Sequence, residues 1–162
     1  DYDYIKKTKA NLILKDEKSN SLSAYYKINY ECKKRQIPLF IANNVNLLFK
    51  LKIKNFYISA FNKKKYCNLS HKINIIGSAH NLIEILEKRS QGCKKIILSR
   101  LFQTYKKGHL NIIKFNLLAL NYKNIVALGG INERNYKKLK MVNCEGFAMQ
   151  SELNRKPQYL AG

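Results

Sequence analysis

Acidic residues are scarce in this chain: 162 residues contain 10 Asp and Glu against 31 Lys and Arg, a formal net charge of +21. Such a charge raises the question of a nucleic acid or an anionic membrane as partner. The basic residues are mostly Lys and are spread along the chain. Lys, Asn, Ile and Tyr all have AT-rich codons, so an AT-rich genome can produce this profile without selection for a basic surface. We therefore expect phosphorylated small-molecule substrates rather than nucleic acid.

Long apolar runs are also lacking. No run approaches the length of a membrane span, and the start, "DYDYIKKTKAN", does not have the pattern of a signal peptide. The hydrophobic content of 46% argues against a disordered chain. We expect a cytoplasmic protein with no membrane partner, and one domain over residues 1–162.

The cysteines are few and far apart. Cys32, Cys67, Cys93 and Cys144 form no CxxC pair and no cluster with His. This spacing argues against structural zinc and against a disulfide framework, and it favours reduced thiols.

Short apolar or β-branched runs recur along the chain, and most of them are continuous rather than alternating, as in parallel strands buried on both faces. The expected strands are 11–14, 37–42, 55–59, 73–77, 95–99, 124–128 and 145–149.

Helical patterns lie between these runs, at 20–36 and at 110–122, and residues 1–10 resemble the end of another helix. In "NLIEILEKRSQG", Asn81 is the expected N-cap, Glu84 completes a capping box, and Gly92 ends the helix. In "INERNYKKLKMV", Asn132 is the expected N-cap, with Glu133 in the first turn and lysines toward the end.

Alternating strands and helices predict a parallel sheet with its active site at the carboxyl ends of the strands. The regular repeat favours a (β/α)8 TIM-barrel type that lacks its first strand, a truncation that would fit a start without Met. An open doubly wound sheet is the alternative. A barrel open at the missing strand would expose unpaired edges, so we expect a tendency to form homo-oligomers.

Glycine is scarce, yet two of the seven glycines stand together in "VALGGINERN". Gly129 and Gly130 follow an expected strand and precede an expected helix, whose N-terminus would bind an anion such as phosphate. Ser151, after the last strand, would add a hydroxyl. The competing interpretation is a tight strand-to-helix turn.

Two further loops carry candidate chemistry. In "LSRLFQTYKKG", Thr104, Lys106, Lys107 and Gly108 suit a phosphate or diphosphate, although a solvated lysine loop has the same composition. In "GSAHN", Ser78 and His80 follow another strand, where a histidine can act as an acid-base group or bind phosphate, although a lone histidine is more often a polar loop residue.

The segments "IPLFIANNVNLL", "IIGSAHNLIE", "LSRLFQTYKKG", "VALGGI" and "EGFAMQS" resemble the thiamine phosphate synthase/TenI family in order and spacing, over residues 11 to 153. The resemblance implies a (β/α)8 barrel that joins hydroxymethylpyrimidine diphosphate to thiazole phosphate with Mg²⁺. It assigns thiazole-phosphate binding to Thr104, Lys106, Gly129, Gly130, Gln150 and Ser151. It assigns pyrimidine-diphosphate binding to Lys15, Asn43, Ser78 and Lys107.

The sequence departs from the family in the half of the site that binds metal and diphosphate. "ILKDE" stands where the family has "QLREK", which puts Glu17 where a lysine is expected. Asn43 stands where a magnesium carboxylate is expected, and neutral Asn is a poor magnesium ligand. "AFNKKKYC" contains no acid where the second carboxylate is expected. We therefore assign no metal ligand, and Mg²⁺ remains a family expectation.

Three functions stay open. The first is a synthase-like transferase that relies on Lys107, with lysines replacing part of the magnesium charge. The second is a TenI-like thiazole phosphate tautomerase with His80 as its catalytic acid-base group, for which the loss of the metal acids is harmless. The third is a non-catalytic protein that binds phosphate or, less favoured, nucleic acid.

Overall fold

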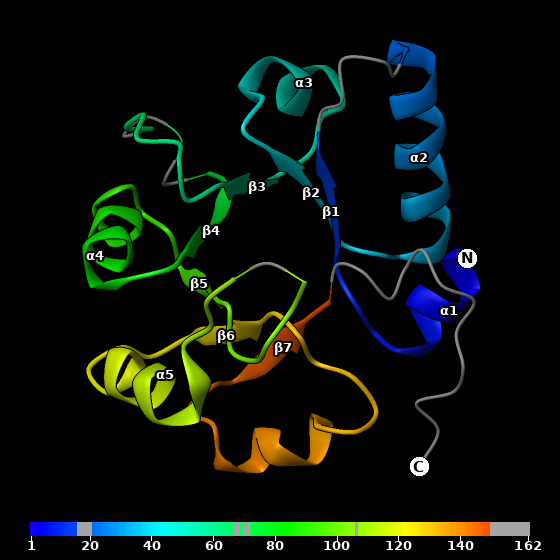
Figure 1. Ribbon diagram of the computed structural model, residues 1–162. Helices are drawn as coiled ribbons and strands as arrows, with labels where there is room; N and C mark the ends of the chain where they lie inside the picture. Colours follow the sequence, from blue (N-terminus) through cyan, green and yellow to red (C-terminus); the bar gives the residue numbers. More distant parts are fainter. Residues whose placement is uncertain (16–20, 67–68, 70–71, 106, 150–162) are drawn as a thin grey trace.

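Seven parallel strands form one curled sheet in the order β1-β2-β3-β4-β5-β6-β7, so every strand pairs with its neighbours in sequence (Figure 1). The computed structural model describes residues 1–15, 21–66, 69, 72–105 and 107–149. The strands are β1 (Leu12–Lys15), β2 (Leu39–Ala42), β3 (Asn55–Ile58), β4 (Asn74–Ala79), β5 (Lys95–Ser99), β6 (Ile125–Leu128) and β7 (Gly146–Ala148). All seven expected strands are confirmed, with ends that move by one or two residues.

Continuous apolar runs form these strands because the sheet is covered on both faces. All four residues of β2 are buried, as are the last five residues of β4. Alternate residues serve different faces: Ile41 packs with the helices outside the sheet, while Phe40 packs with Tyr57, Ile76 and Ile97 on the inner face. The helices lie outside the arc of strands in Figure 1. This is the α/β, TIM-barrel type of architecture that the sequence predicts.

The described residues form five α-helices, which cover the outer face of the sheet or flank it. They are α1 (Tyr2–Lys7), α2 (Leu22–Arg35), α3 (Val45–Lys50), α4 (Leu82–Ser90) and α5 (Asn111–Ala119). The expected helices at 1–10, 20–36, 81–92 and 110–122 are confirmed as α1, α2, α4 and α5. Helix α3 was not predicted from the sequence because it is only six residues long, although Asn44 caps it by accepting a hydrogen bond from the Leu47 N–H.

The ends of α4 follow the predicted signals with one difference. Asn81 Oδ1 accepts a hydrogen bond from the Glu84 N–H, and Gly92 with φ of 83° follows the last turn. The Cys93 N–H donates to Lys88 O, which completes a Schellman motif. The Glu84 carboxylate, however, accepts from the N–H of His80 rather than of Asn81. The predicted capping box is therefore shifted by one residue.

The predicted helix from Asn132 is wrong in type and start. The structure has a 3₁₀ helix, η1 (Tyr136–Met141), whose N-cap is Asn135, three residues after the predicted cap. Asn132 Oδ1 accepts from the Arg134 N–H, and Asn135 Oδ1 accepts from the Asn132 N–H. These side chains satisfy the backbone in a turn, and short polar side chains that do so compete with helix formation.

Strands β1 and β7 are the edges of the described sheet. The expectation that unpaired edges promote homo-oligomers stays a prediction, as does the single domain over 1–162. Cys32, Cys93 and Cys144 carry free thiols. Within the described part of the chain, no helix has both the length and the apolar character needed to cross a bilayer.

Candidate functional site

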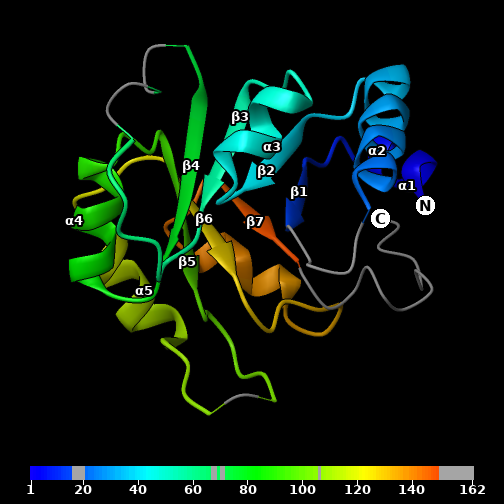
Figure 2. The same cartoon turned by 90° about the horizontal axis from the view of Figure 1, so that it is seen from above.

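The carboxyl ends of the strands bring most of the predicted site residues to one end of the sheet. Lys15 ends β1, Asn43 follows β2, Ser78 and His80 lie at the end of β4, Thr104 and Lys107 follow β5, and Gly129 and Gly130 follow β6. The loop after β5 lies in front of the strands in Figure 1 and extends beyond the sheet in Figure 2. Lys106, Gln150 and Ser151 lie outside the described residues.

Gly129 and Gly130 lie against the loop that follows β5. The Phe102 N–H donates to Gly129 O at 3.0 Å, so the two segments that follow β5 and β6 remain paired past the ends of these strands. A β-carbon on Gly129 would lie 2.9 Å from the β-carbon of Arg100, and one on Gly130 would lie 2.5 Å from Gln103 O. Both glycines have φ in the left-handed region, at 106° and 68°. Glycine is thus required by the neighbouring loop, whatever ligand binds.

The prediction of an anion-binding α-helix directly after Gly130 is wrong. Since η1 begins at Tyr136, no α-helical N-terminus follows the glycines directly. Gly130 O instead accepts hydrogen bonds from the side-chain amides of Asn132 at 3.1 Å and Asn135 at 2.7 Å. The glycine turn is held by amide side chains, and the helix-dipole argument for phosphate at this position does not apply.

Arg100 braces the loop that carries Thr104 and Lys107. Its Nε donates to Gly108 O at 3.1 Å and its guanidinium NH2 donates to Lys107 O at 2.7 Å. The fixed fork of a guanidinium bonds two neighbouring carbonyls at once. The sequence singled out this loop for its lysines and gave Arg100 no role, although an Arg directly after a buried strand is a usable signal.

Ser78 is buried on the inner face at the end of β4, in the strand itself rather than in the loop after it. Its Oγ accepts from the Tyr57 hydroxyl at 2.9 Å and from the Ala60 N–H at 3.0 Å. Burial raises the pKa of Tyr57, and the bond to Ser78 opposes that rise. Since both bonds use Ser78 as acceptor, its own proton is left to point elsewhere. Sequence reasoning missed Tyr57 because it lies inside an apolar run.

His80 forms a pair with Glu84. His80 Nδ1 lies 2.9 Å from Glu84 Oε2, and the His80 N–H donates to the same oxygen at 2.7 Å. Burial by itself would raise the pKa of Glu84, but the hydrogen bonds from His80 outweigh it and lower the pKa. A carboxylate that fixes one ring nitrogen leaves the other available for proton transfer.

Asn43 and Asn62 occupy the region where the family resemblance implies Mg²⁺. Asn43 Oδ1 accepts from the Ser59 N–H and from Asn62 Nδ2, each at 3.0 Å. Two donors therefore face the oxygen that would have to coordinate the ion, and neither side chain carries charge. In the described part of the chain no three His, Cys, Asp or Glu residues group as metal ligands. These residues do not fit a magnesium site.

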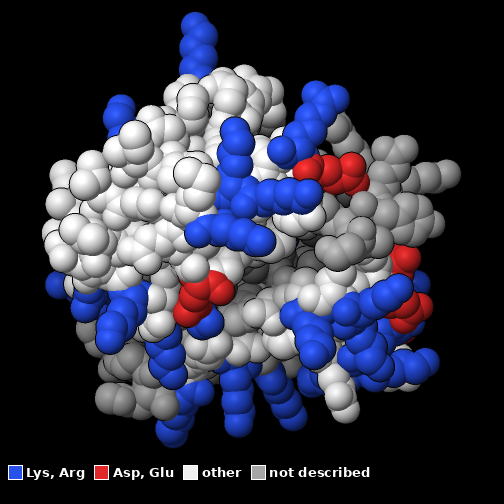
Figure 3. Space-filling view, turned by 90° about the horizontal axis from the view of Figure 1, so that it is seen from below, with Lys and Arg blue, Asp and Glu red and all other residues white. Residues whose placement is uncertain are grey.

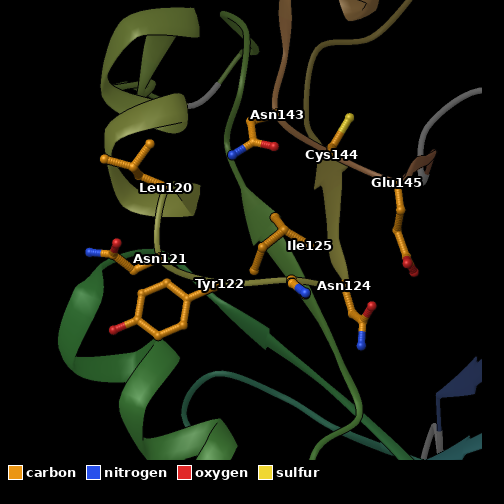
Figure 4. A pocket seen from close by; sticks show the side chains of 9 residues that line it. Leu120, Asn121, Tyr122, Asn124, Ile125, Asn143, Cys144 and Glu145 are labelled. Carbon is orange, nitrogen blue, oxygen red and sulfur yellow. The ribbon is translucent and has the colours of Figure 1, made fainter.

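A hollow of about 460 Å³ lies elsewhere, between α5 and the amino ends of β6 and β7 (Figure 4). Ile125 opens β6, and Cys144 and Glu145 precede β7. Barrel enzymes work at the carboxyl ends of their strands, so this hollow lies at the wrong end for the predicted chemistry.

On the face seen in Figure 3 the positive charge is distributed rather than gathered in one stripe. Figure 3 shows Lys and Arg side chains spread over one face of the molecule, with few Asp or Glu among them. A duplex or single strand is usually bound by a continuous basic groove or stripe. The expectation of small phosphorylated substrates rather than nucleic acid stays a prediction.

Residues 6–153 match the model of the family described as thiamine monophosphate synthase. The thiamine-phosphate synthase of Clostridium tetani is 30% identical over 151 residues, covering 85% of this chain and 71% of the relative. The thiamine-phosphate synthase of Clostridium acetobutylicum is 28% identical over 147 residues, covering 83% and 69%.

Two solved structures share the fold. The thiamine phosphate pyrophosphorylase from Pyrococcus furiosus superposes with a TM-score of 0.75 at 14% identity, over 95% of this chain and 81% of that one. The thiamine phosphate pyrophosphorylase from Bacteroides thetaiotaomicron gives a TM-score of 0.62 at 16% identity, over 93% and 75%.

Proposed function

The chain belongs to the thiamine monophosphate synthase family, and we propose that it is a synthase-like transferase of thiamine biosynthesis. It joins hydroxymethylpyrimidine diphosphate to thiazole phosphate and releases pyrophosphate. In this reaction the C–O bond between the pyrimidine methylene and the diphosphate breaks, and the thiazole nitrogen donates the electron pair of the new C–N bond. The curated relatives carry this activity in their names.

One observation supports the proposal most: two predicted phosphate-binding segments lie side by side. The backbone bond from Phe102 to Gly129 O fixes the loop after β5 against the glycines after β6. Arg100 holds the carbonyls of Lys107 and Gly108 in that loop. Two anionic substrates that must meet in one reaction need two such segments at one end of the sheet.

The thiazole phosphate is assigned to the turn after β6 and to the start of the loop after β5. Its proposed ligands are Thr104, Lys106, Gly129, Gly130, Gln150 and Ser151. The pyrimidine diphosphate is assigned to Lys15, Asn43, Ser78 and Lys107. Lys107 supplies the positive charge that the diphosphate leaving group needs as its bond breaks. The proton that Ser78 has left after its bonds to Tyr57 and Ala60 is assigned to a diphosphate oxygen.

A TenI-like tautomerase is the second candidate, and the His80–Glu84 pair favours it. Moving a proton on a thiazole phosphate needs an acid-base group and no metal ion, and His80 is then the catalytic residue. A protein that binds phosphate esters without chemistry is the third candidate.

Lys107→Ala and His80→Ala separate these candidates when each variant is assayed for both reactions. A synthase loses most of its activity in Lys107→Ala and little in His80→Ala, while a tautomerase shows the reverse. Lys114→Ala, an exposed change on α5, is the matched control. If the wild type catalyses neither reaction, both enzymatic candidates are wrong and binding without chemistry remains.

A further inference from the structure

Asn43, Ser59 and Asn62 form a closed group of hydrogen bonds, here called the amide cluster. Asn43 follows β2, and the other two residues follow β3, the neighbouring strand. Asn43 Oδ1 accepts from the Ser59 N–H and from Asn62 Nδ2, both at 3.0 Å, while Asn43 Nδ2 donates to Ser59 Oγ. The cluster therefore ties two adjacent loops together at the carboxyl end of the sheet.

Both the side chain and the backbone carbonyl of Asn62 are held by hydrogen bonds. Its Nδ2 also donates to the Tyr66 hydroxyl at 2.9 Å, and its Oδ1 accepts from the Lys64 N–H at 3.0 Å. Its backbone carbonyl accepts from Lys88 Nζ at 2.6 Å and from Gln91 Nε2 at 2.8 Å. The side chain thus has little freedom to turn toward a ligand.

Lys88 makes this anchoring unusual, because the whole residue is buried. Its Nζ donates to Asn62 O and to Gln91 Oε1, and burial lowers its pKa. A buried ammonium is costly unless it is hydrogen-bonded. The Lys88 ammonium lies against the backbone carbonyl of Asn62 and so adds positive charge next to the amide cluster. This charge repels a cation and disfavours its binding at the cluster.

We propose that the amide cluster replaces a bound divalent ion in this chain, linking the loops after β2 and β3 without metal, so that a diphosphate ligand binds independently of Mg²⁺. The identity of that ligand rests on the proposed function, whereas the replacement of the ion rests on the hydrogen bonds alone. The lysine-rich segment 63–65 supplies charge from the protein at the same end of the sheet.

The test converts the amides back into carboxylates. In Asn43→Asp/Asn62→Asp, two carboxylates face each other at the distance of the present hydrogen bond, so the melting temperature falls by several degrees in a chelator. Millimolar Mg²⁺ recovers it, because an ion then bridges the carboxylates. The wild type melts at one temperature in both conditions. Asn116→Asp, whose amide bonds Met141 O and the Asn143 N–H, is the matched control and gains nothing from Mg²⁺.

The outcomes separate the cluster from the function. A wild type stabilised by Mg²⁺ overturns the proposal, and so does a double variant that Mg²⁺ leaves unfolded or unstabilised. In Asn43→Asp alone, the Ser59 N–H and Asn62 Nδ2 still donate to the side chain at position 43. This single variant is therefore expected to fold, and it serves as the reference for the double variant. Calorimetry with inorganic pyrophosphate in chelator is the second readout: binding is expected, and binding only with Mg²⁺ counts against the proposal. No binding in either buffer refutes the proposed diphosphate site but leaves the melting comparison to decide the cluster.

Discussion

Gly130 and Gln103 approach so closely that a β-carbon on the glycine would lie 2.5 Å from the carbonyl oxygen of Gln103. The next nearest atoms, the carbonyl oxygen and carbon of Phe102, are also backbone and have little freedom to move aside. The glycine pair that the sequence marks as a phosphate turn is therefore first a contact between two loops. A ligand at this position depends on that contact.

Gly130→Ala is expected to destabilise the protein and to weaken phosphate binding together. Left-handed backbone and overpacking add up to roughly 2–5 kcal/mol. Gly108→Ala is the control, because Gly108 also has positive φ, at 80°, but its β-carbon would meet nothing within 4 Å. It should cost only about 1–2 kcal/mol. Urea unfolding measures both, and equal losses would show that the contact with Gln103 carries no energy.

Arg100→Lys is expected to weaken binding of thiazole phosphate about tenfold, since a single ammonium does not hold both Lys107 O and Gly108 O. Calorimetry measures the affinity. Arg89→Lys is the control, because Arg89 stacks over Tyr122 at 5.1 Å, away from the loop. Unchanged affinity in Arg100→Lys would mean that the loop is positioned without its guanidinium.

Cys93 makes stability fall at alkaline pH. Burial raises the pKa of its thiol to about 12, from 9.0. Below pH 9 the thiol is protonated in both states. Above it the unfolded chain releases the proton first, so stability is lost as pH rises from 9 toward 12. Between pH 8 and pH 10 this one group removes on the order of 1 kcal/mol. Urea unfolding of Cys93→Ala should show a pH dependence smaller by that amount, and an identical dependence would contradict the assignment.

The sequence alone determined the strands, most of the helices and the fold class. Buried parallel strands need continuous apolar runs such as Leu39–Ala42, and a local pattern of this kind does not depend on the rest of the chain. The caps at Asn81 and Gly92 are equally local. The pairing of carboxyl ends then follows from parallel order, which is why the predicted site residues could be placed at one end of the sheet.

Only the tertiary structure decided what those residues touch. Position 130 has to be glycine because a β-carbon there would meet the backbone of Gln103. Gln103 lies 27 positions earlier in the sequence, and only the fold brings its loop against Gly130. In the sequence, the segments around Asn43 and Asn62 show only that the expected acidic residues are missing. The fold shows that Asn62 Nδ2 donates a hydrogen bond to Asn43 Oδ1. Local patterns fix periodicity and caps, whereas contacts between loops depend on how adjacent strands end, and no spacing along the chain encodes that.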